Sequence, residues 1–268
     1  MAEYQLGVIG GGNMGEAVLR GLVGRKVLSA GEVVLSEPLA GRRELLAREV
    51  GVTCVGDNLT PAGCPRVLLA VKPQVMARVL DEIAPAVRKD ATVISIAAGI
   101  TTSFIAARLG GRGRVVRVMP NTPMLVGAGA AAVAAGPGAT DEDLAWTEKL
   151  FAASGRTVVV AEKLMDAVTA VSGTGPAYFF YLIEAMIAAG VAEGLDPHAA
   201  AMLATQTCAG AARLLAESGQ SPQDLRARVT TPGGTTQRAI ETMDAAGVKE
   251  ALVRAIRAAA ARSRELGK

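Results

Sequence analysis

The chain has 268 residues, of which 50% are hydrophobic, 3% aromatic and 20% charged, a globular composition large enough for one big domain or two modest ones. Its formal net charge of +3 comes from scattered charges with few aromatic residues between them, so the sequence disfavours nucleic-acid binding. The three cysteines, Cys54, Cys64 and Cys208, lack a metal-binding or redox spacing and His198 is the only histidine, so we expect no metal site.

Two stretches have the length of a membrane segment, but neither has its pattern. Residues 118–140 carry no charge, yet prolines such as Pro120 prevent a continuous helix there. Residues 178–195 are interrupted by Glu184 and Glu193. We therefore expect no contact with a membrane, and the scattered cysteines favour a reducing, cytoplasmic location.

The first part of the chain alternates short apolar runs with helical patterns. The apolar runs predict strands at residues 5–10, 32–36, 66–71, 92–97, 114–119 and 156–161. Helical periodicity appears at residues 14–22 and near 40–49, 74–87 and 102–109. This alternation predicts a doubly wound, mainly parallel sheet of the Rossmann type.

The strands stop after about Lys163, and only helical patterns follow. They cover residues 176–191, 198–218, 222–229, 236–246 and 248–266. The first of these helices is apolar nearly all round, which in a chain of this size indicates a subunit interface. We therefore predict an α/β protein with a dinucleotide-binding domain at residues 1–162 and an all-α dimerisation and substrate domain at residues 163–268.

The first predicted strand leads into the glycine-rich segment GVIGGGNMGEAVLRGL, where Gly10, Gly12 and Gly15 have the G-x-G-x-x-G spacing. The spacing alone is weak evidence, but an apolar strand before it and an amphipathic helix after it indicate a dinucleotide-binding turn. Gly10 permits a tight turn, Gly12 lets the backbone approach a pyrophosphate, and Gly15 lets the helix pack close to the strand. The pyrophosphate would then lie at the helix N-terminus.

The residues after the second strand give conflicting signals about the form of the cofactor. Glu37 stands where an acid usually binds the adenosine ribose hydroxyls and disfavours a 2′-phosphate. Ser36 and the pair Arg42 and Arg43 are close enough in sequence to bind such a phosphate. The sequence therefore predicts NADPH or NADH without deciding between them.

Four further segments extend this pattern: AVKP (Ala70–Pro73), RVMPNTP (Arg117–Pro123), AVSGTGPAYFF (Ala170–Phe180) and DLRARVTTPGGTT, which ends at Thr236. With the glycine turn, they make the chain similar, over essentially its whole length and in the same order, to the pyrroline-5-carboxylate reductases. The resemblance implies reduction of a five-membered cyclic imine carboxylate to proline, the last step of proline synthesis, with NADPH or NADH. It also implies an obligate homodimer, in some members part of a larger ring such as a decamer.

The resemblance assigns roles by position as well. Together with the residues already singled out, the expected cofactor contacts are Gly10, Gly12, Asn13, Met14, Gly15, Ser36, Glu37, Asn58, Ala70, Val71, Lys72, Pro73, Asn121, Thr122 and Pro123. The expected substrate contacts are Ser172, Thr231, Gly233, Gly234 and Thr235, and the expected catalytic residue is Thr236. Threonine replaces the family's usual serine at positions 174 and 231, and both changes keep the hydroxyl.

The segment TTPGGTTQ, residues 230–237, has the form of a carboxylate-binding loop. Its glycines permit backbone N–H groups to converge at the start of the next helix, where the helix dipole also favours an anion. Because a cyclic iminium can arrive already protonated, no strong acid is required. We expect the Thr236 hydroxyl, together with a water molecule, to supply the proton to the product nitrogen.

Simpler interpretations stay open for single residues. Lys72 can be a solvated surface lysine, and Asn121 between two prolines can be a turn residue. His198 fits a helix start at the surface. Gly173 and Gly175 can serve close helix packing alone.

Three other functions are open alternatives. A β-hydroxyacid dehydrogenase resembles this organisation but carries a lysine in the first long helix of its second domain, and residues 175–191 contain no lysine. A dinucleotide-sensing regulator would have no need of the TTPGGTT loop. A reductase of a different cyclic imine, such as a six-membered one, is compatible with the same residues.

Overall fold

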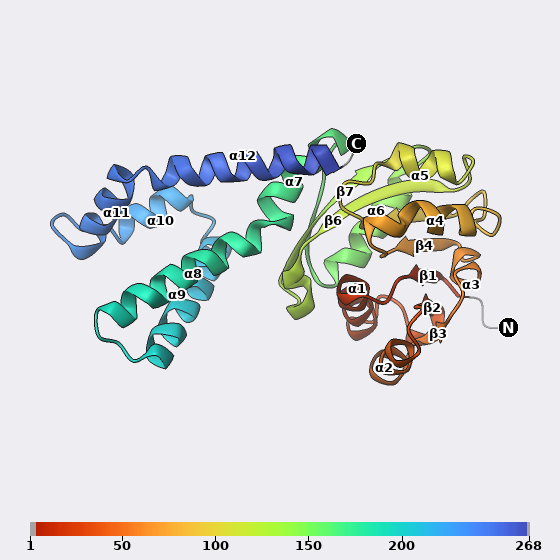
Figure 1. Cartoon of the computed structure of the whole chain (residues 1–268), viewed down its shortest axis with the longest axis horizontal. Helices are drawn as coiled ribbons and strands as arrows, with labels where there is room; N and C mark the ends of the chain where they lie inside the picture. The colour runs from red at the N-terminus through yellow and green to blue at the C-terminus, as the bar shows by residue number, and fades with distance from the viewer. Residues whose placement is uncertain (1–3, 267–268) are drawn as a thin grey trace. The chain divides into compact units, whose positions relative to one another are not determined.

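Residues 4–266 are described in the computed structural model, and they form two compact units (Figure 1). The first unit comprises the described residues up to Thr174 together with those from Ala259 onward, and the second comprises Gly175–Ala258. The division falls within one continuous helical segment, Glu162–Ala192. The functional boundary predicted between residues 162 and 163 stays a prediction.

A single sheet of eight strands organises the first unit, in the order β3-β2-β1-β4-β5-β6-β7-β8. Each strand is parallel to its neighbours except at the β6–β7 pair, which is antiparallel. The strands are β1 (Leu6–Ile9), β2 (Val33–Ser36), β3 (Thr53–Val55), β4 (Arg66–Leu69), β5 (Thr92–Ser95), β6 (Arg114–Pro120), β7 (Gly129–Ala135) and β8 (Gly155–Val159).

Helices connect these strands and cover both faces of the sheet (Figure 1). The α-helices are α1 (Asn13–Gly24), α2 (Ala40–Val50), α3 (Leu59–Ala62), α4 (Pro73–Ile83), α5 (Thr102–Arg108), α6 (Asp141–Ala152) and α7 (Met165–Val168). Shorter segments are the 3-10 turns η1 (Ala30–Glu32), η2 (Thr122–Val126) and η3 (Glu162–Leu164), and the π-helical turn η4 (Thr169–Gly173).

Two apolar cores fill the space between sheet and helices, because side chains alternate between the two faces of a strand. One core joins the sheet to α1, α2 and α6, and its members include Leu6, Val8, Leu68, Ile94 and Val116 on the strands and Leu19, Leu46 and Phe151 on the helices. The opposite core joins the sheet to α4 and α5 through Ile9, Val67, Leu69, Val93, Val115, Leu80 and Ile105. The predicted doubly wound, mainly parallel sheet is confirmed.

The structure also contains strands and α-helices that the sequence interpretation did not predict, namely β3, β7, α3, α6 and α7. The segment between residues 118 and 140, which we described only as unable to form a continuous helix, holds the end of β6, the turn η2 and the antiparallel strand β7. The helix α6 starts at a capping box, in which the Thr140 hydroxyl accepts from the Asp143 N–H and the Asp143 carboxylate accepts from the Thr140 N–H.

The same Asp143, whose side chain is buried, forms an ion pair with the partly exposed Arg114. Its carboxylate accepts hydrogen bonds from Arg114 Nε at 2.6 Å and Nη2 at 2.9 Å, and from the Thr92 hydroxyl. Burial by itself would raise the pKa of Asp143, but the hydrogen bonds from Arg114, Thr92 and Thr140 outweigh it and hold the pKa well below the usual range. The pair fixes α6 to β5 and β6.

The second unit is entirely helical. It comprises α8 (Gly175–Ala192), α9 (Pro197–Ser218), α10 (Pro222–Arg228), α11 (Thr235–Ala245) and most of α12 (Val248–Leu266), whose last turns belong to the first unit. There Ser263 Oγ donates to Asp166 Oδ1 of α7 at 2.6 Å. The predicted helical second half is confirmed.

Most large apolar side chains of the second unit are exposed in the single chain, including Phe179, Phe180 and Tyr181 of α8. By length and composition alone, the helical segment Glu162–Ala192 could cross a membrane, and only 6% of its most apolar window is buried within the chain. Glu184 lies within this segment and Glu193 directly after it, and a single helix that passes on length and composition alone is weak evidence for a membrane span.

Candidate active site

The turn between β1 and α1 requires glycine at two of its positions. Gly10 has a φ of +107°, and a Cβ atom there would lie 2.7 Å from the carbonyl oxygen of Ala70. A Cβ atom on Gly15 would lie 2.3 Å from the carbonyl oxygen of Gly10. Any larger residue would therefore push α1 away from the ends of β1 and β4.

The N-terminus of α1 is open to a ligand. Its N-cap residue is Gly12, so no side chain caps the first N–H groups of the helix, and a Cβ atom built on Gly12 meets nothing within 4 Å. The first turn of a helix leaves N–H groups without intrahelical acceptors, and the helix dipole adds positive potential there. These residues fit the pyrophosphate of a dinucleotide.

A cavity of about 500 Å³ extends from this turn. It is lined by Gly12, Asn13, Met14, Ala70, Val71, Lys72, Pro73, Ile96, Ala97 and Ala98. These residues follow the carboxyl ends of β1, β4 and β5, and β1 and β4 flank the point at which the strand order reverses. Ligands of doubly wound sheets bind at this place.

The cavity therefore brings Gly12, Asn13 and Met14 of the glycine turn together with the Ala70–Pro73 segment, whereas Gly10 and Gly15 do not line it. Sequence reasoning missed Ile96, Ala97 and Ala98, although a signal existed. They directly follow β5, which our strand prediction had extended to residue 97, and the ends of neighbouring parallel strands share one edge of a sheet. Lys72 is exposed as the N-cap residue of α4.

Directly after β2, the Glu37 carboxylate already accepts hydrogen bonds from two backbone N–H groups. Its carboxylate accepts a hydrogen bond from the Gly11 N–H at 3.0 Å and another from the Leu39 N–H at 3.1 Å. The side chain is buried and braces the glycine turn. Beside it, the Ser36 hydroxyl donates to Asn58 Oδ1, and Asn58 Nδ2 donates to Glu82 at 3.0 Å.

Of the two arginines that follow, Arg42 contacts the glycine turn and Arg43 contacts the segment after β2. Arg42 Nε donates to the carbonyl oxygen of Gly11 at 2.8 Å, and its guanidinium also pairs with Glu16. Arg43 Nη1 donates to the carbonyl oxygens of Glu37 at 2.8 Å and Pro38 at 2.9 Å. Within residues 4–266, Arg43 has no carboxylate partner, so its charge is available beside Ser36 and Glu37.

Asn121 follows β6 and does not line the cavity of the glycine turn. Its Nδ2 lies 3.3 Å from Ser172 Oγ and 3.4 Å from the Ser172 carbonyl oxygen, and its Oδ1 accepts from the Ala130 N–H at 2.8 Å. The structure thus brings an expected cofactor residue and an expected substrate residue together. Thr122 and Pro123 form the first turn of η2.

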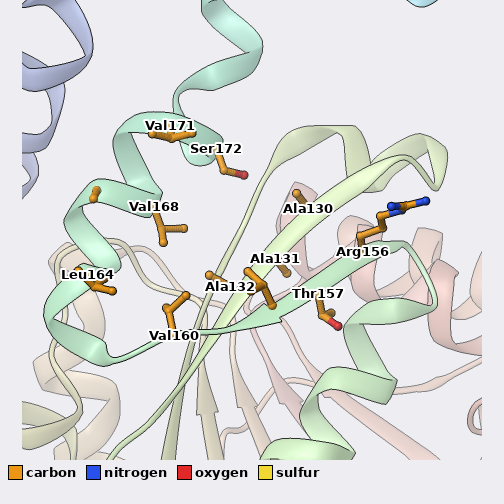
Figure 2. Close-up of a pocket in the computed structure, with 12 residues that line it drawn as sticks. Ala130, Ala131, Ala132, Arg156, Thr157, Val160, Leu164, Val168, Val171 and Ser172 are labelled. Atoms are coloured by element: carbon orange, nitrogen blue, oxygen red, sulfur yellow. The ribbon is translucent and has the colours of Figure 1, made fainter. Parts of the chain in front are cut away.

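Figure 2 shows an apolar groove of about 480 Å³ that opens beside Ser172. Residues of β7 and β8, such as Ala132 and Thr157, form one side, and Leu164, Val168 and Val171 of the facing helical segment form the other. Apart from Ser172, the groove contains none of the expected site residues.

The glycine loop of the second unit, residues 230–237, leads directly into the N-terminus of α11. Gly233 has a φ of +71°, and its N–H donates to Gln237 Oε1 at 2.6 Å. The helix α11 then starts from Gly234, again an N-cap residue without a side chain. A Cβ atom on Gly234 would lie 2.5 Å from Thr231 Oγ1, so glycine lets that hydroxyl approach the helix end.

Three hydroxyl groups surround this second helix N-terminus, from Thr231, Thr235 and Thr236. In the described part of the chain, none of these hydroxyls makes a hydrogen bond. Thr231 and Thr235 are exposed and Thr236 is partly buried. Uncapped N–H groups and unused hydroxyls together fit a carboxylate.

The histidine and the buried cysteine of the described chain do not add a catalytic group to the site. The His198 N–H is capped by Asp196 Oδ1 at 2.9 Å in the first turn of α9, as expected of a surface helix start. Burial raises the pKa of Cys64 to about 11, which keeps it an unreactive thiol. Among residues 4–266, no group of three or more histidine, cysteine or acidic side chains could hold a metal ion.

A glycine turn at the N-terminus of α1, placed where the strand order reverses, defines the first unit as a Rossmann-type dinucleotide-binding domain of an oxidoreductase. Family comparisons agree with this class. Residues 5–99 match the family described as NADP oxidoreductase, coenzyme F420-dependent. Residues 162–266 match the family described as pyrroline-5-carboxylate reductase dimerisation.

Individual relatives match over nearly the whole chain. The pyrroline-5-carboxylate reductase of Synechocystis is 43% identical over 267 residues, covering 99% of each chain. The structure of the enzyme from Coxiella burnetii superposes with a TM-score of 0.94 at 34% identity, covering 99% of each chain. That of the Plasmodium falciparum enzyme, solved with NADP bound, gives 0.88 at 29% identity, covering 100% of each chain.

The chain belongs to the pyrroline-5-carboxylate reductase family. The enzyme predicted from the sequence is confirmed at this level: an oxidoreductase that reduces 1-pyrroline-5-carboxylate to L-proline with NAD(P)H. The β-hydroxyacid dehydrogenase and sensor alternatives are therefore set aside.

Proposed function

We propose that the cavity beside α1 holds the reduced dinucleotide. Its pyrophosphate would contact the N–H groups at Gly12 to Met14, and its nicotinamide would extend along Ala70–Pro73. The support is the cavity at the carboxyl ends of β1, β4 and β5 and the uncapped start of α1. The further cofactor contacts that we propose are Gly10, Gly15, Ser36, Glu37, Asn58, Thr122 and Pro123.

The substrate carboxylate is assigned to the loop before α11. The N–H groups at its start and the hydroxyls of Thr231 and Thr235 would replace an arginine. A hydrogen bond to a charged oxygen contributes about 1.5–3 kcal/mol, and a helix N-terminus about 0.3–2 kcal/mol. A few such contacts suffice to orient a small ring. Gly233 and Gly234 give the loop its shape, and Ser172 is proposed as a further substrate contact.

Thr236 has the role of proton donor. When bound, the reduced nicotinamide supplies a hydride to the carbon of the C=N bond. The nitrogen gains one proton in the same overall reaction, and the Thr236 hydroxyl, which has no partner among the described residues, would deliver it directly or through water. Most of the acceleration would come from alignment of the ring, for which about 7–11 kcal/mol is available in principle.

One observation carries this assignment. Each unit contains a helix that starts at a glycine N-cap residue with no side-chain cap, Gly12 in the first and Gly234 in the second. Two such anion sites match the two anionic groups of the reactants, the pyrophosphate and the carboxylate.

The direct test mixes the purified protein with 1-pyrroline-5-carboxylate and either NADPH or NADH, and follows the loss of reduced-nicotinamide absorbance. We expect rapid loss that depends on the imine. If both cofactors bind and neither is oxidised, the substrate is a different imine, and a six-membered cyclic imine is the next to try.

For the cofactor form, we propose that NADPH is used and that Arg43 permits it. An arginine near the end of β2 accommodates the 2′-phosphate in NADP-dependent Rossmann domains. Arg43 donates only to backbone carbonyls within the described chain, whereas Arg42 is paired with Glu16. Glu37 opposes a phosphate less than its position suggests, because both of its oxygens already accept backbone N–H groups.

We also propose that the functional protein is at least a homodimer, able to assemble into a larger ring such as a decamer. The dimerisation match begins at residue 162, in agreement with a functional domain at residues 163–268. We propose that a second copy, rather than a membrane, covers the apolar surface of α8, and that the enzyme is cytoplasmic and binds no nucleic acid. A fully active monomer in sedimentation would contradict this proposal.

A further inference from the structure

The helical segment that carries Ser172 departs from α-helical geometry just there. The Thr174 N–H and the Thr174 hydroxyl both donate to the Thr169 carbonyl oxygen, at 2.8 Å and 3.0 Å, which makes residues 169–173 a π-helical turn. Such turns are rare and occur frequently at functional sites. Ser172 lies within the turn.

A proline explains why this turn leaves one carbonyl group in need of a partner. In an α-helix, the Ser172 carbonyl would accept from the N–H of the residue four positions later, which is Pro176. Proline has no N–H, and its ring also clashes with the carbonyl four residues earlier. The Ser172 carbonyl therefore needs a donor from outside the helix.

Asn121 is that donor. Its orientation is defined, because Oδ1 accepts from the Ala130 N–H at 2.8 Å and the amide nitrogen must then face the other way. Nδ2 lies 3.4 Å from the Ser172 carbonyl oxygen and 3.3 Å from its hydroxyl oxygen. One carboxamide thus connects the start of β7 to both oxygens of Ser172.

The π-helical turn packs against the end of β6. A Cβ atom on Gly173 would lie 2.4 Å from Cε at the tip of the flexible Met119 side chain, the residue before the last one of β6. In Figure 2 the Ser172 side chain extends from the helical turn toward Ala130, the residue whose N–H holds Asn121. Sequence-distant residues are thereby fixed against one another, all within the first unit.

The direction of the hydrogen bonds determines what Ser172 can do. Because the Ser172 hydroxyl oxygen accepts from Asn121, its own hydrogen is free to be donated. A serine hydroxyl otherwise rotates among several positions. The Asn121 amide therefore selects a donor orientation, which suits a carboxylate oxygen.

We propose that Asn121 is a positioning residue that acts on the substrate through Ser172 and does not touch the cofactor. Asn121 holds the π-helical turn by supplying the donor that Pro176 lacks, and it presents the Ser172 hydroxyl as a hydrogen-bond donor to the imine carboxylate. This inference rests on the proposed role of Ser172 as a substrate contact.

The test is a double-mutant cycle with Asn121→Ala, Ser172→Ala and the double variant, measured for kcat, for KM of the imine and for Kd of NADPH. Each single change is expected to raise KM of the imine about 10-fold, the effect of losing one hydrogen bond to a charged group. The double variant is expected to match Ser172→Ala, because the two residues act as one unit. The Kd of NADPH is expected to stay within about two-fold of wild type.

Two outcomes would overturn the inference: independent effects that multiply in the double variant, or a weaker NADPH affinity in Asn121→Ala. If the wild-type protein does not oxidise NADPH with the imine at all, the proposed function itself has failed, which this control reveals before any variant is made. Gln220→Ala, which removes a partly buried carboxamide that accepts from Arg228 within the second unit, is the matched control and should behave as wild type.

A second pair of variants separates positioning from folding. Combining Asn121→Ala with Pro176→Ala restores a backbone N–H where the Ser172 carbonyl can accept it, so the melting temperature is expected to recover at least half of its loss. KM of the imine is expected to stay raised, because the hydroxyl still lacks its partner. Recovery of KM together with stability would show that Asn121 only supports the fold and would refute the positioning role.

Discussion

The two units differ in where their apolar side chains lie. The first unit buries almost all of the chain's apolar core in two layers around the sheet, whereas Ala200 and Ala204 are the buried apolar residues of the second unit's described helices. In the second unit, long apolar side chains such as Phe180 and Leu203 face outward. Exposed apolar surface of this extent normally marks an interface.

Because of this difference, a binding site in the first unit can form within one chain, whereas one in the second unit is expected to need a partner chain. The first unit forms the cavity at the glycine turn by itself, because the strands that end there are fixed by cores within the same unit. The loop before α11 belongs to the second unit, whose helices bury few apolar side chains within one chain. We infer that cofactor binding depends on local geometry in the first unit, and that turnover additionally depends on assembly.

The largest effect is expected when a charge is placed on α8. Phe180→Glu would have to bury an unpaired carboxylate in the dimer, at a cost of about 3–5 kcal/mol, which weakens association about 100-fold or more. Sedimentation and activity measured on the same sample should both show the loss, with the folded first unit still binding cofactor. Arg213→Glu, at an exposed position of α9, is the control. An active Phe180→Glu monomer would show that turnover does not depend on assembly through α8.

A substitution in the glycine turn is expected to have the opposite effect: it should weaken cofactor binding and leave assembly intact. Gly15→Ala places a Cβ atom 2.3 Å from the Gly10 carbonyl oxygen, and overpacking of this kind costs about 1–3 kcal/mol. Cofactor affinity, measured by fluorescence titration, should fall about 10- to 100-fold while the dimer persists. Gly24→Ala at the other end of α1 meets no atom within 4 Å and should bind cofactor normally.

The ion pair of the first unit should make its stability depend on acid. Because the pKa of Asp143 is held below its usual value, its contribution is present above the unfolded pKa of about 4 and is lost as pH falls toward the lower folded value. Asp143→Asn should reduce the free energy of unfolding at pH 7 by about 1–3 kcal/mol and flatten the loss below pH 4. Urea denaturation at both pH values measures this, and an unchanged acid dependence would contradict it.

A smaller change in activity is expected from a substitution near the proposed binding site of the cofactor's adenosine. Arg43→Ala should lower kcat/KM with NADPH about 10-fold relative to NADH, the loss of one hydrogen-bonded charge contact. Equal losses with both cofactors would instead mean that Arg43 only braces the turn through the carbonyl groups of Glu37 and Pro38.

Features that depend on local sequence patterns could be predicted from the sequence, and features that depend on contacts between distant residues could not. The glycine turn, most strands and the second-unit helices follow from local patterns, and these were correct. The strand β7 was missed because its glycine- and alanine-rich sequence contains a single β-branched residue, Val133, whereas strands are typically rich in them. The helix α6 was missed although its capping residues Thr140 and Asp143 were visible in the sequence.

The contacts within the candidate site were harder to predict, because they join distant segments. Asn121 and Ser172 are separated by 51 positions, and nothing local indicates their hydrogen bond. The exception is Pro176, whose missing N–H indicates that the carbonyl four residues earlier needs another donor. Arg42 was likewise expected near a phosphate, but its guanidinium donates to the Gly11 carbonyl oxygen and pairs with Glu16.

We propose that the first unit binds the cofactor, while the loop of the second unit binds and protonates the substrate. The decisive experiment compares the wild-type protein with Thr236→Val for oxidation of NADPH by 1-pyrroline-5-carboxylate, with cofactor affinity measured in parallel. We expect an unchanged affinity and a turnover lower by at least about 100-fold, the usual contribution of a positioned proton donor. Turnover within a few-fold of wild type would show that Thr236 is only part of the scaffold and would refute its role as proton donor.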